Sequence, residues 1–389
     1  MKRTIRDLKN ITGKRVLVRC DFNVPLDKYG YIKDDTRIVE ALPTIQYLVE
    51  KNAKVILCSH LGRPKGFDKW LSLFPVAVYL MRKFPNRVRF CDRTVGPDVM
   101  AEISKMKKGQ ILVLENTRFV PGEEANSEGF ASQLASLADL YVDDAFGSAH
   151  RKHASNYGVA LKLPNAIGFL MEKELKVFDE LFHETKHPFV AVVGGAKVED
   201  KLKLIQNFIG KADTIIIGGA MAYTFLLAQG YNVGDSPVVM NQVQQAMKLL
   251  NTAKEKGVKV LLPVDHIVMK KGKDSVFDTK TLSRGMVGYD IGKKSIKLFS
   301  DAILKAKTVV WNGPVGKYED KRFARGTTEI AKAIAKSKAY SVVGGGDSVS
   351  AVRDCGVAKK ISHISTGGGA SLQLMSGKTL PAVEIIGDV

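Results

Sequence analysis

The chain has 389 residues, of which 45% are apolar and 25% are charged, as is typical of a folded globular protein. This composition excludes intrinsic disorder, a collagen-like repeat and a disulfide-rich scaffold. Lysine and arginine (59) outnumber aspartate and glutamate (40), which gives a formal net charge of +19 and favours anionic partners.

Short apolar runs alternate with helical patterns along the chain, as is typical of parallel strands covered by helices on both faces. The runs are 15–19, 55–58, 111–114 and 140–142 in the first half, and 189–193, 214–217, 259–262, 308–311 and 340–343 in the second. The length predicts two domains, so we expect an α/β fold with two doubly wound parallel-sheet lobes.

One helix is predicted to join these lobes as a hinge. Leu175, Phe178, Leu181 and Phe182 recur at helical spacing within 172–182, and Pro188 ends the pattern. We therefore predict a first domain over 1–170, a connecting helix over 171–187, and a second domain over 188–374.

The sequence predicts neither a disulfide framework nor a membrane segment. Its four cysteines form no C-x-x-C pair and are interpreted as reduced, mostly buried thiols of a cytosolic protein. The charge-free segment 214–234 is interrupted by Gly218 and Gly219, which favours a strand, a turn and a helix over a membrane span. We therefore expect a cytoplasmic protein.

The first four predicted strands end in charged or hydrogen-bonding residues. Ligands of parallel sheets bind beyond the carboxyl ends of the strands, so these side chains are expected to meet. Several arginine forks together favour a small, doubly charged anion, although any single arginine is more simply explained by pairing with a nearby carboxylate. The residues are Arg19, Asp21, Asn23, Ser59, His60, Leu61, Gly62, Arg63, Glu115, Asn116, Arg118, Asp143, Asp144 and Arg151.

The strands of the second half end in glycine instead. Glycine lets the backbone approach a ligand closely, and amides at the start of a helix bind phosphate. A single glycine pair is explained by a tight turn, but the repetition favours a polyphosphate or nucleotide site. The glycine runs are 194–195, 218–219, 344–346 and 367–369.

Two lysines follow the first of these glycine runs. Lys197 and Lys201 are four residues apart and are predicted to share one face of a helix, beside an apolar stripe formed by Val198, Leu202 and Ile205. Lys197 in the first turn would reach a transferring phosphoryl group and Lys201 the inner phosphates; the alternative is two solvated lysines. Neither a Walker A loop nor a dinucleotide-binding G-x-G-x-x-G motif is present.

Asp347, directly after a glycine loop, is a candidate Mg²⁺ ligand, because Mg²⁺ combines one or two carboxylates with substrate phosphates. The alternative is a helix N-cap, and both roles are compatible. His150 and His153 form an H-x-x-H pair with two cations between them, which argues against a metal and favours structural or hydrogen-bonding histidines.

Taken together, these motifs identify a family. The chain resembles phosphoglycerate kinases over nearly its whole length, and the order of the matching strings exceeds what chance produces. The strings are RCDFNVP (19–25), SHLGRPKG (59–66), ENTRF (115–119), DDAFGSAHR (143–151), GGAKVEDK (194–201), IGGAMAYTF (217–225), VWNGPVG (310–316), FARGT (323–327), GGGDS (344–348) and STGGGASL (365–372).

The resemblance implies phosphoryl transfer between 1,3-bisphosphoglycerate and ADP, or in reverse between ATP and 3-phosphoglycerate, in glycolysis. It implies catalytic roles for Arg37, Lys197, Gly346 and Gly369, and a magnesium ligand at Asp347. The implied substrate-binding residues are Asp21, Phe22, Asn23, Arg37, His60, Leu61, Gly62, Arg63, Arg118 and Arg151. The implied nucleotide-binding residues are Gly195, Ala196, Lys197, Lys201, Gly219, Gly292, Asn312, Glu319, Gly345, Gly346, Asp347 and Ser348.

The resemblance also implies a monomer whose tail, about 375–389, returns to the first domain. A carboxylate nucleophile needs no general base, so catalysis is expected to rest on positioning and charge in a closed state. We expect hinge bending near 165–188 and around Ser365–Thr366. Two residues depart from the family pattern: Lys293 follows Gly292 where proline is usual, and His266 stands where an apolar residue is usual.

The competing hypothesis is a basic polyanion-binding or nucleic-acid-binding protein on an inactive kinase scaffold. The lysines are scattered, and no aromatic residues interleave with them as a stacking platform requires. We therefore expect small-molecule partners, with no membrane and no specific nucleic acid.

Overall fold

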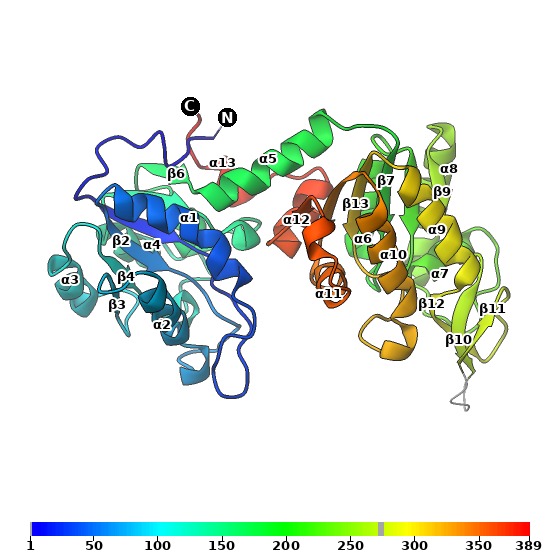
Figure 1. Ribbon diagram of the computed structural model, residues 1–389, viewed down its shortest axis with the longest axis horizontal. Helices are drawn as coiled ribbons and strands as arrows, with labels where there is room; N and C mark the ends of the chain where they lie inside the picture. Colours follow the sequence, from blue (N-terminus) through cyan, green and yellow to red (C-terminus); the bar gives the residue numbers. More distant parts are fainter. Residues whose placement is uncertain (1, 271–275) are drawn as a thin grey trace. The chain divides into compact units, whose positions relative to one another are not determined.

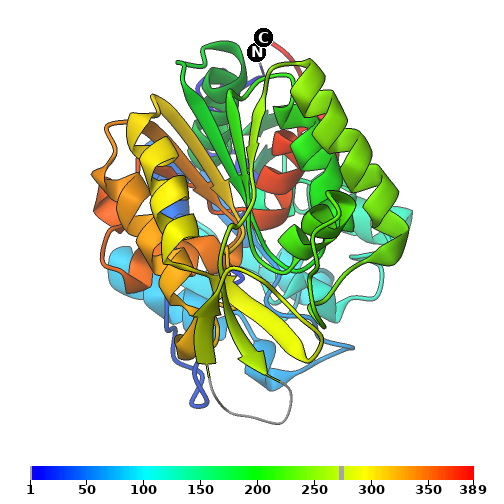
Figure 2. The same cartoon turned by 90° about the vertical axis from the view of Figure 1, so that its right-hand side faces the viewer.

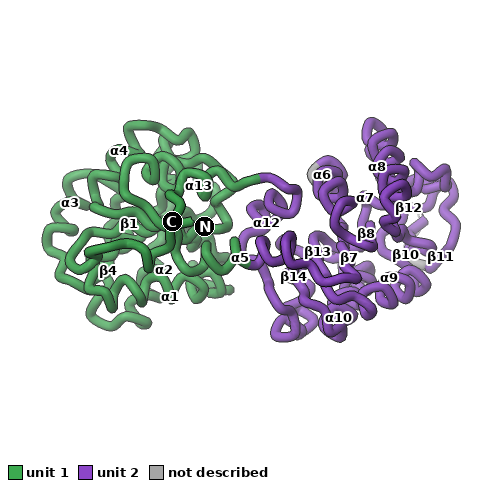
Figure 3. Tube along the Cα trace, turned by 90° about the horizontal axis from the view of Figure 1, so that it is seen from above, with its two compact units in different colours: residues 1–176, 379–389 green, residues 177–378 purple. Residues whose placement is uncertain are grey.

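The computed structural model describes residues 2–270 and 276–389. For Asp200, Val276 and Phe277 it describes the backbone alone. The chain divides into two compact units, 1–176 with 379–389 (unit 1) and 177–378 (unit 2), which are coloured separately in Figure 3. Each unit is described by itself.

Unit 1 is built on a six-stranded, wholly parallel sheet of order β3-β4-β2-β1-β5-β6. The four predicted strands are confirmed. Strands β3 and β6 were not predicted, because each is short and includes a polar residue, Arg89 and Asn165. Successive residues Val16, Leu17 and Val18 are all fully buried, as expected of a strand covered on both faces. The strands are β1 Arg15–Arg19, β2 Lys54–Cys58, β3 Val88–Phe90, β4 Ile111–Val113, β5 Leu140–Asp143 and β6 Asn165–Ile167.

The helices of unit 1 bury apolar stripes against this sheet (Figure 1). Ile38, Ile45 and Leu48 of α1 are fully buried in the same cluster as Val16 and Val18 of β1. The helices are α1 Thr36–Glu50, α2 Phe74–Lys83, α3 Pro97–Ser104, α4 Glu128–Ser136, the first part of α5 Phe169–His183, and α13 Pro381–Glu384. Helix α5 covers the predicted connecting helix and continues from unit 1 into unit 2.

The end of the chain, 379–389, belongs to unit 1 and lies beside its beginning. The amide of Arg3 donates to the carbonyl of Gly387 at 2.8 Å, and the amide of Ala382 donates to the carbonyl of Ala149 at 3.1 Å. The two ends of the chain therefore lie side by side in unit 1, as Figure 3 shows.

Unit 2 repeats the design with a six-stranded parallel sheet of order β15-β14-β13-β7-β8-β9. The five predicted strands are confirmed, and β15 is the additional one. Trp311 of β13 and Phe299 of α9 are fully buried in one cluster with Ile330 of α10. The strands are β7 Phe189–Val193, β8 Thr214–Ile217, β9 Lys259–Leu261, β13 Thr308–Asn312, β14 Tyr340–Gly344 and β15 His363–Ile364.

The helices of unit 2 are α6 Glu199–Phe208, α7 Met221–Ala228, α8 Val243–Glu255, α9 Lys293–Lys305, α10 Arg325–Lys336, α11 Gly346–Asp354 and α12 Gly368–Met375. The charge-free segment 214–234 forms β8, a turn and α7, as predicted. In the part of the chain that the structure describes, no helix combines the length and apolar character needed to cross a membrane.

A small antiparallel sheet of order β11-β10-β12 was not predicted from the sequence. It comprises β10 His266–Lys270, β11 Val276–Thr279 and β12 Met286–Ile291, and Figure 2 shows it at one end of unit 2, apart from the parallel sheet. Its strands expose polar residues and carry a bulge between Ile267 and Val268, so their sequence has no long apolar run.

Candidate active site

The polar residues predicted in unit 1 follow four strands that are neighbours in the sheet. Strands β4, β2, β1 and β5 are adjacent and parallel, so their carboxyl ends open onto one edge. This arrangement brings together segments that lie more than a hundred residues apart in the sequence.

Arg37 in the first turn of α1 is held by the segment that follows β1. Its Nη1 lies 2.9 and 3.0 Å from the two carboxylate oxygens of Asp21 and donates to the carbonyl of Asn23 at 3.2 Å. Asp21 is 5% exposed, whereas the Arg37 side chain keeps 32% of its surface exposed. Arg37 is therefore oriented by a buried carboxylate and still reaches solvent.

The loop after β2 is fixed by side chains from two neighbouring strand ends. Asn23 Oδ1 accepts the amide of Gly62 at 2.9 Å, and Arg118 Nη1 donates to the carbonyl of Gly62 at 2.6 Å. Asn116 brackets Leu61, accepting its amide at 3.2 Å and donating to its carbonyl at 2.7 Å. These hydrogen bonds hold the backbone of the loop in place at the edge, while the Leu61 side chain is buried in the core.

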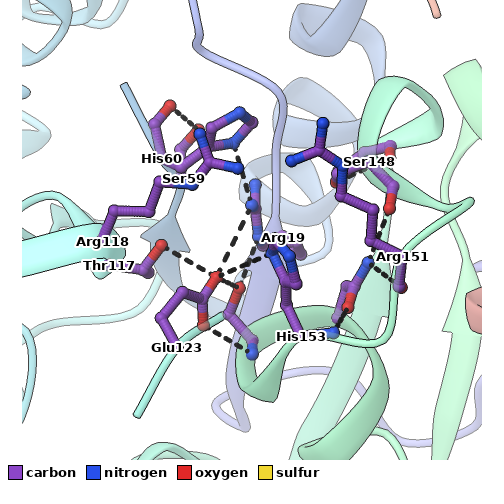
Figure 4. A network of polar contacts seen from close by, with 12 residues as sticks. Arg19, Ser59, His60, Thr117, Arg118, Glu123, Ser148, Arg151 and His153 are labelled. Carbon is purple, nitrogen blue, oxygen red and sulfur yellow. Dashed lines mark hydrogen bonds and ion pairs between the residues drawn. The ribbon is translucent and has the colours of Figure 1, made fainter. Parts of the chain in front are cut away.

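Arginines at this edge have different environments. Arg118 pairs with the exposed Glu124 at 2.9 Å, and Arg151 lies 3.2 Å from His150. Arg63 is exposed and forms no ion pair with a described residue. Arg19 is fully buried and pairs with Glu123, which is the carboxylate pairing that the sequence analysis gives as the simpler explanation for any single arginine (Figure 4).

Buried polar atoms at this edge retain unused hydrogen-bonding capacity. Among the described residues, Arg118 Nε and His150 Nδ1 are buried without a hydrogen-bond partner. Burial lowers the pKa of the Arg118 guanidinium, and burial together with Arg19, Arg118 and Arg37 holds the pKa of His60 well below its usual value. The edge therefore offers positive charge and donors to an anion that replaces water there.

Asp143 and Asp144, also predicted at a strand end, have a structural environment instead. Both are fully buried, and burial raises the pKa of each to about 7. Asp144 Oδ1 accepts the amides of Leu170 and Met171 at 2.9 and 3.1 Å, at the start of α5. These carboxylates stabilise the end of β5 and the beginning of α5.

In unit 2 the glycine runs follow β15, β14, β7 and β8, which together with β13 are adjacent in the sheet. The amide of Gly195 donates to the carbonyl of Pro314 at 2.8 Å, and that of Gly219 to the carbonyl of Val315 at 2.8 Å. Gly195 has a φ of +109°, which an L side chain rarely adopts. Glycine at these positions allows the loops after β7, β8 and β13 to pack closely against one another.

Two helix N-termini lie close together beside these loops. Helix α11 begins at Gly346, after Gly345 with a φ of +92°, and α12 begins at Gly368. A Cβ placed on Gly368 would lie 3.6 Å from the Cα of Gly345, so the two backbones are close. Gly369 is the second residue of α12. The free amides at the two starts create a positive, anion-binding surface.

Asn312 at the end of β13 connects this surface to α6. Lys201 Nζ donates to Asn312 Oδ1, while Asn312 Nδ2 is buried and has no hydrogen-bond partner among the described residues. That amide nitrogen lies beside Gly345. An orphaned buried donor next to two helix starts and a lysine is suited to phosphate oxygens.

The prediction that Lys197 lies on a helix with Lys201 is wrong. Helix α6 begins at Glu199, and Lys197 lies in the preceding loop, because Gly195 is committed to the backbone contact with Pro314. The predicted apolar stripe is confirmed by the burial of Val198, Leu202, Ile205 and Ile209. Lys197 is exposed and forms no ion pair with a described residue.

The other predicted nucleotide residues differ in exposure. Ala196, Glu319 and Asp347 are exposed, whereas Gly292 is buried against Asp265 at the start of α9. Asp347 is the second residue of α11, so the N-cap interpretation is wrong and Gly345 holds that position. Ser348 is fully buried and accepts the amide of Gly313 through Oγ at 2.7 Å, which fixes the loop after β13.

The two departures from the family pattern have local structural explanations. Lys293 is the first residue of α9, a position that any good helix former accepts. Asp265 caps this helix by accepting the amides of Lys294 and Ser295 at 2.7 and 2.8 Å. His266 is 4% exposed, with Nδ1 3.4 Å from Tyr223 Oη, and burial lowers its pKa to about 4.

The two histidines of the H-x-x-H pair have different hydrogen bonds: Nε2 of His150 accepts from Arg151 Nε at 3.2 Å, whereas His153 is bonded through its backbone. The amide of His153 donates to Asn156 Oδ1 at 2.9 Å, and burial lowers the pKa of His153 to about 4. No group of three or more His, Cys, Asp or Glu side chains suited to a metal occurs among the described residues.

Comparison with known proteins gives one consistent result. The family model described as phosphoglycerate kinase matches residues 5–378. The chain is 50% identical over 394 residues to a phosphoglycerate kinase of Dictyoglomus turgidum, and 50% identical over 394 residues to one of Pseudothermotoga lettingae, covering 100% of this chain and 99% of each relative.

Solved structures agree in fold as well as sequence. The phosphoglycerate kinase of Coxiella burnetii superimposes with a TM-score of 0.88 at 38% identity, covering 99% of both chains. That of Pyrococcus horikoshii gives a TM-score of 0.85 at 33% identity, covering 99% of this chain and 98% of the other. The resemblance inferred from the motifs is confirmed.

Proposed function

Because the chain belongs to the phosphoglycerate kinase family, we propose that its two units divide the two substrates of that reaction between them. The chain is a phosphotransferase of glycolysis that moves a phosphoryl group between 1,3-bisphosphoglycerate and ADP, or from ATP to 3-phosphoglycerate. None of the comparisons points to the polyanion-binding alternative.

Unit 1 binds the phosphoglycerate. The observation that supports this assignment is the polar edge formed by β4, β2, β1 and β5, where Arg37 is oriented by Asp21 and the Gly62 loop by Asn23 and Arg118. A substrate with a carboxylate and a phosphate at its two ends suits several guanidinium groups. The full proposed set is Asp21, Phe22, Asn23, Arg37, His60, Leu61, Gly62, Arg63, Arg118 and Arg151.

Unit 2 binds the nucleotide. Its phosphates are cradled by the starts of α11 and α12, by Lys201 and by the orphaned Asn312 amide. The full proposed set is Gly195, Ala196, Lys197, Lys201, Gly219, Gly292, Asn312, Glu319, Gly345, Gly346, Asp347 and Ser348.

Magnesium enters with the nucleotide. Asp347 is exposed in the first turn of α11, next to the proposed phosphate site, and one carboxylate together with phosphate oxygens and water meets the octahedral demand of Mg²⁺. The ion would supply positive charge beside the nucleotide phosphates. Asp347 would hold it from the protein side.

Transfer proceeds without a general base, because the acceptor carboxylate is already ionised at neutral pH. Arg37 of unit 1, and Lys197, Gly346 and Gly369 of unit 2, stabilise the charge that develops on the transferring group. This scheme requires the units to close around both substrates and exclude water, with hinges near 165–188 and Ser365–Thr366. We further propose that the enzyme is a cytoplasmic monomer.

The direct test is turnover of 3-phosphoglycerate with ATP, followed by a coupled reductive assay that consumes the acyl phosphate. We expect turnover with Mg²⁺ and its loss when EDTA is added. Folded, nucleotide-binding protein that gives no turnover with Mg²⁺ would overturn the assignment.

A further inference from the structure

A fully buried network lies beneath the proposed phosphoglycerate site in unit 1. Arg19 at the end of β1 and Glu123 are both 0% exposed, and Arg19 Nη2 lies 3.9 Å from Glu123 Oε1 (Figure 4). Burying two charges is unfavourable unless they are paired and further hydrogen-bonded. The pair is accordingly surrounded by further hydrogen bonds.

The hydrogen bonds of this network run from Arg19 through Ser155 to Glu123. Arg19 Nε donates to Ser155 Oγ at 2.7 Å, and Ser155 Oγ donates its only proton to Glu123 Oε1 at 2.5 Å. Glu123 Oε1 also accepts from Thr117 Oγ1 at 3.1 Å, and Oε2 accepts the amide of Ser155 at 3.0 Å. In this network both oxygens of Glu123 act as acceptors, and Arg19 acts only as a donor.

The charge state of Arg19 is secured by this pairing. Burial by itself lowers the pKa of Arg19, but the negative charges of Glu123 and Asp21 outweigh it, so the pKa lies above its usual value. Arg19 therefore presents only N–H donors to its neighbours, because a guanidinium has no acceptor.

Arg19 has two further partners: its Nη1 donates to the carbonyl of Cys20, and its Nη2 faces His60. Arg19 Nη2 lies 3.1 Å from Nδ1 of His60, and among the described residues no other side chain is hydrogen-bonded to this ring (Figure 4). A ring nitrogen facing a guanidinium must carry a lone pair, so the proton of the neutral imidazole is on Nε2.

We propose that the buried Arg19–Glu123 pair holds His60 as the neutral tautomer protonated on Nε2, so that His60 offers one fixed N–H donor to the anionic substrate. Arg19 and Glu123 are thus positioning residues, and His60 is the group that touches the substrate. This inference rests on the proposed assignment of the phosphoglycerate to unit 1.

The surroundings of His60 favour the same state from every side. Burial, together with the positive charges of Arg19 on β1, Arg118 in the turn after β4 and Arg37 on α1, disfavours a second proton on the ring. His153, before the buried segment 154–158, has a pKa lowered to about 4 by burial and is neutral at pH 7. A doubly protonated His60 would place an N–H against the guanidinium of Arg19. The positive charge of the site is therefore supplied by arginines alone.

The test is a long-range ¹H–¹⁵N correlation spectrum of the full-length protein with ¹⁵N-labelled histidine, in which His60→Asn identifies the His60 signals. We expect an unprotonated Nδ1 and a protonated Nε2 at pH 7 in the free enzyme. A proton on Nδ1, or on both nitrogens, would overturn the proposal.

The role of Glu123 is tested by Glu123→Gln, with the exposed Glu128→Gln as the control. In the Glu123 variant we expect the single tautomer to be lost and the KM for 3-phosphoglycerate to rise about tenfold, as for a weakened charge-assisted hydrogen bond, with the KM for ATP unchanged. An unchanged His60 spectrum in the folded variant would refute the positioning role.

The tests remain decisive if the Glu123 variant does not fold or if the wild-type enzyme does not bind 3-phosphoglycerate. If Glu123→Gln does not fold, Ser155→Ala interrupts the same network without removing a charge, and an unchanged His60 spectrum there would refute the role equally. If the wild-type enzyme fails to bind 3-phosphoglycerate, the proposed function is wrong, while the spectrum of the free protein still decides the tautomer.

Discussion

Replacing Gly346 with proline would test the helix-start cradle by removing a single backbone donor. Gly346 is the first residue of α11 and is exposed, and a Cβ built on it meets no atom within 4 Å. Proline is well accepted at this position because its fixed φ suits the first helical residue and the amide there has no partner within the helix. Gly345 before it has a ψ of 138°, which also suits a following proline.

The expected loss in kcat follows from the removal of one amide donor, while the stability of the fold is expected to be kept. One amide donor to a developing oxyanion is worth about 2.7–4 kcal/mol, or roughly 10²–10³ in kcat. Restricting the unfolded chain offsets any strain and leaves the free energy of unfolding within about 1 kcal/mol. Gly346→Ala is the matched control, because it adds a side chain but keeps the amide.

The assay compares both variants in ATP- and Mg²⁺-dependent turnover of 3-phosphoglycerate, with stability measured by urea titration. We expect Gly346→Pro to lose roughly 10²–10³ in kcat relative to Gly346→Ala, at similar stability. Equal kcat in the two variants would refute the claim that this amide contacts the transferring group.

Three other predictions concern charge and motion. Arg37→Ala should lower kcat by roughly 10²–10³ while raising the KM for 3-phosphoglycerate less than about tenfold; a loss confined to KM would make Arg37 a ground-state binder. The raised pKa of Asp144, about 7 against an ordinary 3.8, means that the native state holds a proton the unfolded state releases, so stability falls as pH rises from about 4 to 7. Asp144→Asn should therefore gain stability relative to wild type at pH 8 compared with pH 5, by about 2–3 kcal/mol in denaturant titrations; no change in that difference would place the carboxyl in a solvated site. Small-angle scattering should show compaction only with both substrates bound, and an unchanged radius of gyration would contradict closure.

The parallel sheets could be predicted because their strands are buried on both faces and are therefore continuously apolar. The same reasoning located the two candidate sites. Residues that directly follow adjacent parallel strands lie at the same edge of the sheet, so the polar residues of unit 1 and the glycines of unit 2 are brought together there. It failed for the sheet of β10, β11 and β12, whose strands have one exposed face and a bulge at Ile267. Strand β15 has only two residues, His363 and Ile364, and is too short to leave a pattern in the sequence.

The candidate site shows the same limits at the level of single residues. Lys197 was predicted on a helix from its spacing to Lys201, but the start of α6 depends on a contact between Gly195 and Pro314, which are far apart in the sequence. The carboxylate that pairs with Arg19 could not be identified either, because Glu123 follows a different strand. Long-range pairing of this kind leaves no local signal in either segment.

The central claim is that unit 1 binds the phosphoglycerate and unit 2 the nucleotide, and crossed calorimetric titration tests it most directly. Arg63→Ala should weaken 3-phosphoglycerate binding by roughly 10- to 100-fold and leave ADP affinity unchanged, as expected for one lost charge-assisted contact on an exposed loop. Lys201→Ala should do the reverse. Either variant losing affinity for the other unit's ligand, or for both ligands alike, would contradict the division.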